Sequence, residues 1–165
     1  MIGTVNFAQL MRNYPTNEDL NHDALFAELG WDDLIKKPAY ENTCAIRMSY
    51  CLVKSGVDIA EGRFKIKKGP YKGKCIEPGH GKLSHILAQN NYFGPPRKFK
   101  RGEEDQVLEK QRGILSFFEI PGYLEGRGGH IDIIREEKFL LFFDMFVCGT
   151  HCYWSANEFW FWPIK

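Results

Sequence analysis

Two side chains in this sequence have the types and settings that nucleophilic catalysis needs, Cys44 and His130. Cys44 follows Asn42-Thr43, which predicts a helix N-terminus, and the helix over Cys44–Ser55 is apolar on most sides. Unpaired backbone N–H groups and the positive end of the dipole at such a position favour a thiolate over a thiol. The same N–H groups would stabilise the oxyanion formed when a thiolate attacks an amide carbonyl.

His130 directly follows the glycine-rich run Gly126–Gly129 and begins an apolar segment, His130–Ile134, that is typical of a strand. Glycines before a strand allow another backbone or a substrate to approach closely. A base at the start of a strand, facing a nucleophile at the start of a helix, is the arrangement that cysteine catalysis requires. A structural role competes with each assignment, because cysteine is among the most frequently buried residue types and a strand histidine is more often packed than catalytic.

The elements that must position these two residues are helical first and extended later. Breaks at Gly30, Pro38, Gly56 and the Gly94–Pro96 run separate the helical patterns. Helices are predicted over 5–13, 23–29, 31–35, 44–55 and 82–90, and strands over 63–67, 113–120, 130–134, 139–143 and 158–162. Helices followed by an antiparallel sheet predict an α+β fold in a single domain, residues 1–165. The basic cluster Arg97–Arg101 is predicted as a solvated loop that leads into a helix with acidic residues at its start.

The composition excludes several function classes. The 22 Lys and Arg residues nearly balance the 21 Asp and Glu residues, so a net charge of +1 gives no argument for nucleic-acid or anionic-membrane binding. We find no apolar run near the roughly 20 residues that cross a bilayer and no basic leader of a signal peptide, so synthesis in the cytoplasm is expected. The five cysteines leave at least one thiol unpaired in a monomer. His151 lies between Cys148 and Cys152, but without a second clustered pair we expect no zinc site, and no cofactor is predicted.

Several segments resemble the type VI secretion amidase effectors, family four, which have a papain-like, NlpC-type cysteine peptidase fold. These segments are Asn42–Ser49 (NTCAIRMS), Gly129–Ile133 (GHIDI), the aromatic ending Cys152–Trp162 and the opening Val5–Pro15. The resemblance implies an antibacterial peptidoglycan amidase, a DL-endopeptidase that cuts the stem peptide between D-glutamate and diaminopimelate. It also implies a cognate immunity protein that blocks the active site, and secretion into the periplasm of target bacteria without a signal peptide. In that compartment a Cys148–Cys152 disulfide is plausible.

The third member of the expected Cys/His/Asp site is where the sequence departs from the family pattern. Relatives can use an aspartate close to a cysteine pair, but Cys148–Cys152 contains none. Asp132 lies two residues along the strand and therefore shares the face of His130. Asp144 would lie opposite His130 if residues 135–139 form a turn. We favour Asp132 because its placement does not depend on that turn, and His151 is a third candidate.

Two other functions fit the same residues. A noncatalytic binding module would keep the fold without activity, and a cysteine acyltransferase would pass the acyl group to an amine instead of water. A serine hydrolase is disfavoured because the sequence contains no Gly-x-Ser-x-Gly motif. We therefore predict a hydrolase in which the Cys44 thiolate attacks the amide carbonyl and His130 transfers the protons.

Overall fold

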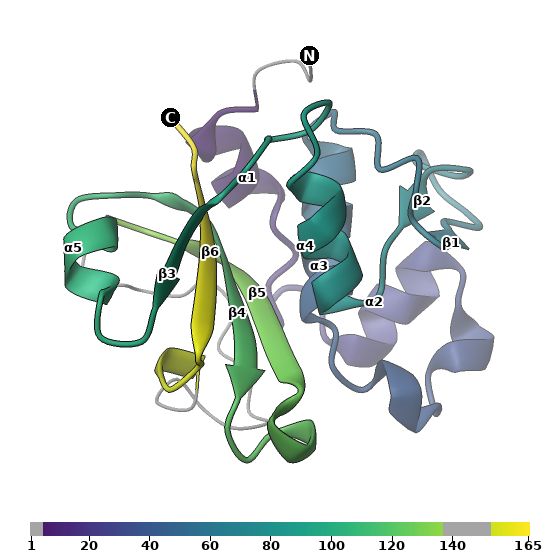
Figure 1. Ribbon diagram of the computed structural model, residues 1–165. Coiled ribbons are helices and arrows are strands. Elements are labelled where there is room, and N and C mark those ends of the chain that lie inside the picture. Colours follow the sequence, from purple (N-terminus) through teal and green to yellow (C-terminus); the bar gives the residue numbers. More distant parts are fainter. Residues whose placement is uncertain (1–4, 137–152) are drawn as a thin grey trace.

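The computed structural model describes residues 5–136 and 153–165 (Figure 1), and they form helices packed on an antiparallel sheet. The α+β fold predicted from the sequence is therefore confirmed. The elements are α1 (Phe7–Asn13), α2 (His22–Leu29), η1 (Asp32–Leu34), η2 (Pro38–Tyr40), α3 (Cys44–Lys54), β1 (Phe64–Lys65), β2 (Cys75–Ile76), α4 (His80–Leu87), β3 (Arg97–Lys100), α5 (Glu104–Leu108), β4 (Gly113–Ile120), η3 (Leu124–Gly126), β5 (Gly128–Ile134) and β6 (Glu158–Pro163).

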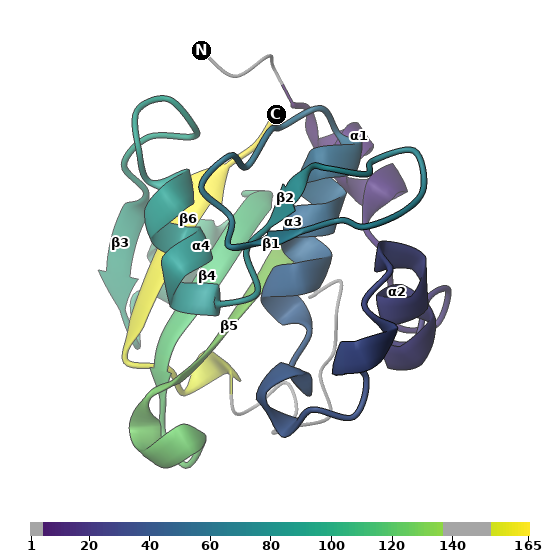
Figure 2. The same ribbon diagram turned by 90° about the vertical axis from the view of Figure 1, so that its right-hand side faces the viewer.

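The larger sheet is antiparallel throughout, with the strand order β3-β6-β4-β5. Helix α4 contacts β4 and β5, and α3 contacts both β5 and α4. The short hairpin of β1 and β2 lies on the far side of α3, next to α2, as Figures 1 and 2 show from two directions. Helix α3 is therefore covered by the sheet on one side and by α2 with the hairpin on the other.

Capping side chains define the first two helices. Asn6 and Gln9 form a reciprocal capping box at the start of α1. The side chain of Asn21 accepts a hydrogen bond from the backbone N–H of Ala24 at the start of α2. Gly30 ends α2 with φ 77°, a left-handed conformation that costs glycine little. These local signals explain why the helices begin and end close to the predicted positions.

Helix α3 contributes to two separate hydrophobic clusters. One cluster joins α3 to the sheet, α1 and α4, and the other joins it to α2, Trp31 and the hairpin. Met48 and Leu52 face the first cluster, whereas Ile46 and Tyr50 face the second. Every residue from Cys44 to Val53 is buried. The prediction that this helix is buried on most of its circumference is confirmed.

Arg47 is a charged residue within this buried helix, and its side chain is 0% exposed. Its guanidinium donates hydrogen bonds to the backbone carbonyls of Pro15 (2.8 Å) and Leu20 (2.6 Å), and its Nε donates to the Thr43 hydroxyl (2.9 Å). A buried cation is tolerated only when its donors are satisfied. Arg47 therefore links the first turn of α3 to the segment between α1 and α2.

The basic cluster Arg97–Arg101 differs from its prediction as a loop, because Arg97–Lys100 form strand β3 and pair with β6. Phe99 points inward and stacks on Phe159 at a centroid distance of 4.8 Å, whereas Lys98 and Lys100 are exposed. Lysines on an edge strand are common because they discourage pairing with other chains. The strand was not predicted because Phe99 is the one apolar residue in Arg97–Lys100, so the segment lacks the apolar alternation by which strands are recognised.

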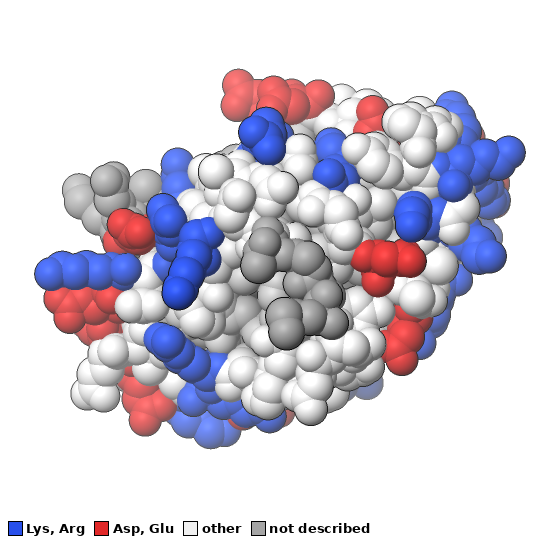
Figure 3. All heavy atoms as spheres, turned by 90° about the horizontal axis from the view of Figure 1, so that it is seen from above, with Lys and Arg blue, Asp and Glu red and all other residues white. Residues whose placement is uncertain are grey.

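Other boundaries also shift. Helix α4 begins at His80, two residues before the predicted start, and β5 begins at Gly128. The strand predicted over 139–143 lies outside the described residues. Along the described chain, no helix is long and apolar enough to span a membrane. Exposed lysines gather on the β1–β2 hairpin, which lies at the right in Figure 1, and the right-hand side of Figure 3 is rich in Lys and Arg. The hairpin lysines are Lys65, Lys67, Lys68, Lys72 and Lys74.

Replacing Arg47 with Ala should lower the free energy of unfolding by about 3 kcal/mol, because two buried carbonyls lose their donor and a cavity forms. Urea denaturation followed by circular dichroism measures this change. Arg97→Ala is the matched control, since Arg97 is exposed, and it should stay within about 0.5 kcal/mol of the wild type. Equal stability of the two variants would contradict a structural role for Arg47.

Candidate active site

The first turns of α3 and α4 and the start of β5 lie at the same end of the molecule, the lower end in Figures 1 and 2. A solvent-open cavity of about 240 Å³ lies between them. It is lined by Ala39, Asn42, Cys44, Pro78, His80, Gly81, Tyr123, Leu124, Arg127, Gly128 and Gly129. Cys44 is only 2% exposed, so the cavity reaches a residue that is otherwise buried.

Asn42 fixes the backbone next to Cys44. Its Oδ1 accepts a hydrogen bond from the Cys44 N–H at 3.0 Å, and its Nδ2 donates to the Tyr123 hydroxyl at 2.8 Å. Thr43 is the N-cap residue, but its side chain makes no capping hydrogen bond. Because the Cys44 N–H already donates to Asn42, the expectation that this group holds an oxyanion would require Asn42 to give way. The helix therefore begins where the sequence predicted, but the Cys44 N–H, which the sequence left available for an oxyanion, donates to Asn42 in the structure.

His130 and Asp132 lie on one face of β5, as the strand period predicts. The Nε2 of His130 and the Oδ2 of Asp132 are 3.0 Å apart, and both side chains are buried. The second carboxylate oxygen, Oδ1, accepts the backbone N–H of Ile133 at 2.7 Å. The Tyr153 ring stacks on the His130 ring with centroids 4.0 Å apart and planes at 7°. The imidazole is thus held in one orientation by a carboxylate and an aromatic face.

The protonation of His130 follows from its two polar neighbours. Desolvation by burial lowers its pKa, but hydrogen bonds to Asp132 and Cys44 outweigh that effect and raise the pKa to about 9. At neutral pH the ring is therefore an imidazolium between a carboxylate and the Cys44 sulfur. This arrangement can hold a nucleophilic cysteine and supply a proton to a leaving group.

Glycines at the start of β5 make room for two aromatic rings. A Cβ at Gly128 would enter the Tyr123 ring, and a Cβ at Gly129 would enter the imidazole of His80. The sequence predicted that a backbone or substrate approaches this glycine run, whereas in the structure side chains of the cavity wall do so. The glycines therefore set the shape of the cavity beside Cys44.

The segment Pro78–His80, which also lines the cavity, is held by a buried carboxylate, Glu77. Its side chain receives two hydrogen bonds from Arg63, at 2.9 and 2.7 Å, and its Oε2 accepts the Gly79 N–H at 2.7 Å. The Ser49 hydroxyl on α3 bonds to the backbone of Glu77. This network fixes the segment that leads into His80, and Ser49 takes part in it as a structural hydroxyl.

The structure thus brings Cys44, His130 and Asp132 together. Asp144, His151, Cys148 and Cys152 lie outside the described residues, so their predicted roles stay predictions. Four residues around the site carried no functional prediction: Asn42, His80, Tyr123 and Tyr153. Only Asn42 had a local signal, its place before the helix, and the other three reach the site through tertiary packing.

We expect the His130 ring to titrate with a midpoint near pH 9 and at a lower pH in Asp132→Asn, because the carboxylate stabilises the imidazolium. Since its pKa is raised in the folded chain, protonation of His130 stabilises the fold fully below pH 6.5, and this contribution is lost as the pH rises through about 9. Histidine NMR titration measures the midpoint. Asp105→Asn, at an exposed site in α5, is the control and should leave it unchanged. A wild-type midpoint near 6.5 would refute the ion pair.

Solved structures of known effectors have the same fold as this chain. The Tae4–Tai4 effector–immunity complex from Enterobacter cloacae matches with a TM-score of 0.75 and 17% sequence identity, covering 99% of this chain and 100% of that one. The corresponding complex from Salmonella Typhimurium matches with a TM-score of 0.73 and 17% identity, again over 99% and 100% of the two chains.

Sequence comparison identifies the family. A search of curated protein sequences finds no match. A family profile described as type VI secretion system (T6SS), amidase effector protein 4, matches residues 40–162, a range that includes Cys44, His130 and Asp132 and spans well over half of the chain. The protein therefore belongs to the Tae4 family of type VI secretion amidase effectors.

Proposed function

We propose that this effector hydrolyses the bond between D-glutamate and diaminopimelate in peptidoglycan stem peptides, with Cys44 as the nucleophile and His130 as the proton carrier. The family supplies the general class, an antibacterial peptidoglycan amidase that is secreted into target bacteria. The observation that supports the assignment of residues is the position of the His130 imidazolium, between Asp132 and the sulfur of Cys44, a residue that lines an open cavity.

The chemistry has two steps. The Cys44 sulfur attacks the amide carbonyl and forms a C–S bond, and collapse of the tetrahedral intermediate breaks the C–N bond as His130 gives its proton to the leaving amine. In the second step neutral His130 takes a proton from water, which attacks the thioester. The carboxylate product leaves, and the thiolate and imidazolium are restored.

Asp132 is the residue that we propose to orient His130. Its Oδ2 contacts the Nε2 of His130, which directs the other ring nitrogen toward Cys44. A carboxylate in this position fixes the tautomer of the ring and stabilises the imidazolium. Asp144 is the alternative that the sequence left open, and a direct comparison of the two aspartates decides between them.

We further propose that a cognate immunity protein blocks the cavity and that the effector acts in the periplasm of the target cell. The two matched structures are complexes of an effector with an immunity protein, which supports such a partner here. The cavity beside Cys44 is small, so a partner segment seated over it would exclude substrate.

Cys44→Ala should abolish release of diaminopimelate-containing fragments from purified peptidoglycan, as measured by mass spectrometry of the muropeptides, because no other group forms the thioester. Cys75→Ala is the matched control: this thiol lies on β2, outside the cavity, and its loss should leave the rate within about threefold. Cleavage at a different bond would refute the proposed specificity. Transfer of the acyl group to an added amine instead of water would identify an acyltransferase.

Asp132→Asn should lower kcat by about 100-fold, because an amide neither holds the charged ring nor fixes its tautomer. Asp144→Asn, assayed on the same stem peptide, should stay within about threefold of the wild type. The reverse pattern would transfer the orienting role to Asp144, and near-wild-type rates in both variants would exclude both aspartates.

A further inference from the structure

A second histidine lies in the wall of the same cavity, and its surroundings differ from those of His130. His80 is the first residue of α4 and is half-buried. Its Nε2 lies 2.6 Å from the hydroxyl of Ser116 on β4, and that hydroxyl lies 2.7 Å from the hydroxyl of Ser84. The Ser84 hydroxyl in turn lies 2.9 Å from the backbone carbonyl of His80. The four groups form a closed chain of three hydrogen bonds.

Only one set of proton positions satisfies all three contacts. A carbonyl cannot donate, so the Ser84 hydroxyl must donate its single proton to the carbonyl of His80. The proton between Ser84 and Ser116 must then come from Ser116. The Ser116 hydroxyl has no second proton, so Nε2 of His80 carries the hydrogen and donates to it. In a neutral ring the other nitrogen, Nδ1, therefore presents a lone pair.

The ring is neutral because a second positive charge is disfavoured at this place. Burial, together with the nearby charges of His130 and His85, lowers the pKa of His80 to about 3. Within residues 5–136 and 153–165, no acidic side chain is a cause of that shift in pKa. His80 and His130 thus have opposite protonation states at neutral pH, although both lie close to Cys44.

His80 lines the cavity, and its two ring nitrogens have different surroundings. The Nδ1 and Cε1 edge of the ring lies over Gly129, which lines the cavity, while Nε2 points away toward β4. The Phe118 ring, with its centroid 4.7 Å from that of His80, packs against the imidazole and fixes its direction. Among the described residues, Nδ1 makes no hydrogen bond, and it is not sealed from solvent.

We propose that His80 is a substrate-positioning residue whose Nδ1 accepts a hydrogen bond from an N–H of the peptide bound across Cys44. This inference rests on the proposed function and adds a specificity element to the same site. A fixed lone pair attracts an amide or ammonium N–H and repels a carboxylate oxygen, which has no proton to give. Stem peptides carry both kinds of group, so the acceptor selects the register that places an N–H opposite Nδ1.

Two variants separate this role from a structural one. His80→Gln keeps a polar atom near Ser116 but removes the acceptor at Nδ1, whereas His80→Asn keeps a polar atom near Nδ1 and loses the contact with Ser116. We expect His80→Gln to raise KM for the stem tetrapeptide about tenfold with kcat within about threefold, the change for one lost hydrogen bond. His80→Asn should have the lower melting temperature and the smaller rise in KM. The opposite ranking in KM would overturn the proposal.

A spectroscopic measurement needs no variant at position 80. In ¹⁵N-histidine-labelled Cys44→Ala protein without peptide, the His80 ring should show the Nε2–H tautomer. Adding L-Ala-γ-D-Glu-diaminopimelate-D-Ala should shift the Nδ1 resonance of His80, because its lone pair accepts a hydrogen bond from the peptide. A tetrapeptide analogue with propionyl in place of L-alanine distinguishes the sources: a persisting shift identifies a peptide N–H, and a lost shift identifies the ammonium group. Either result supports the proposal.

The outcomes against the two proposals are distinct. If the wild-type protein cleaves the tetrapeptide but the Nδ1 resonance does not move at saturating peptide in the Cys44→Ala protein, His80 is not an acceptor and the proposed function stands. If the wild type does not cleave the tetrapeptide and the Cys44→Ala protein does not bind it, both proposals fail. An Nδ1–H tautomer in the free protein would overturn the assignment of His80 by itself.

Discussion

The burial of α3 from two sides is the constraint on which the rest of the structure depends. A helix that packs against a sheet on one side and a second cluster on the other cannot rotate or slide without exposing apolar surface. Its single buried cation, Arg47, further ties its first turn to backbone carbonyls of the preceding segment. The amino end of α3 is therefore fixed, and Cys44 is held where the cavity opens.

Around that fixed point the electrostatics of the site are asymmetric. His130 has a carboxylate partner and stays protonated, whereas the described side chains that contact the His80 ring are the Ser116 hydroxyl and the Phe118 ring, and His80 stays neutral. Burial lowers the pKa of both rings, so the interactions of His130 with Asp132 and Cys44 account for the difference. One ring can then move protons while the other, in the cavity wall, offers a fixed lone pair, and the proposed chemistry uses no metal or cofactor.

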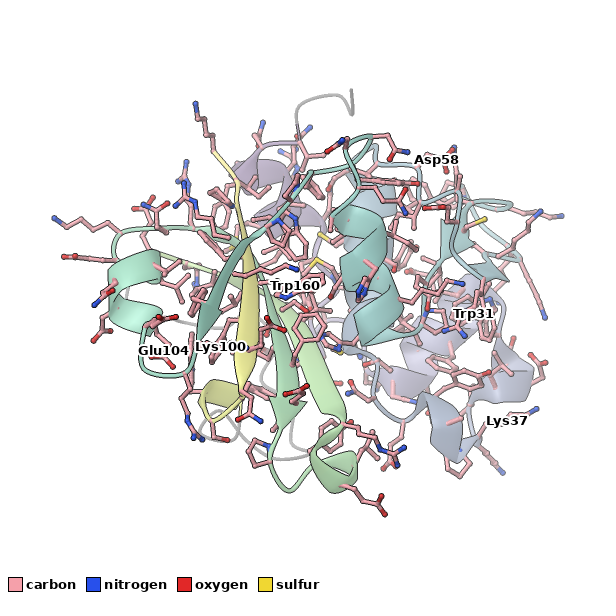
Figure 4. All side chains as sticks on the ribbon, in the orientation of Figure 1. Trp31, Lys37, Asp58, Lys100, Glu104 and Trp160 are labelled. Atoms are coloured by element: carbon pink, nitrogen blue, oxygen red, sulfur yellow. The ribbon has the colours of Figure 1, made fainter. Side chains whose placement is uncertain are left out.

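The aromatic residues of the sheet support this site without entering the proposed reaction. Tyr153 stacks on His130, and Phe117 packs against both rings. Trp160 belongs to β6, and the centroid of its ring lies 4.9 Å from that of His85 on α4. Figure 4 shows Trp160 far from Trp31 of the second cluster. Lys100 and Glu104 lie at the outer edge near α5, far from Trp31 in the same view. The β-strand aromatics thus act mainly as core.

The sequence by itself determined the features that depend on interactions between residues close together in the chain. The start of α3 at Cys44 follows from the residues before it, and the shared face of His130 and Asp132 follows from the two-residue period of a strand. Only the tertiary structure decided which distant side chains complete the site. His80, Tyr123 and Tyr153 meet Cys44 or His130 across 23 to 79 positions of sequence, counted from the residue numbers, and such contacts depend on how helices and strands pack. The edge strand β3 also escaped prediction, because pairing with β6 outweighs the local preference of a charged segment for solvent.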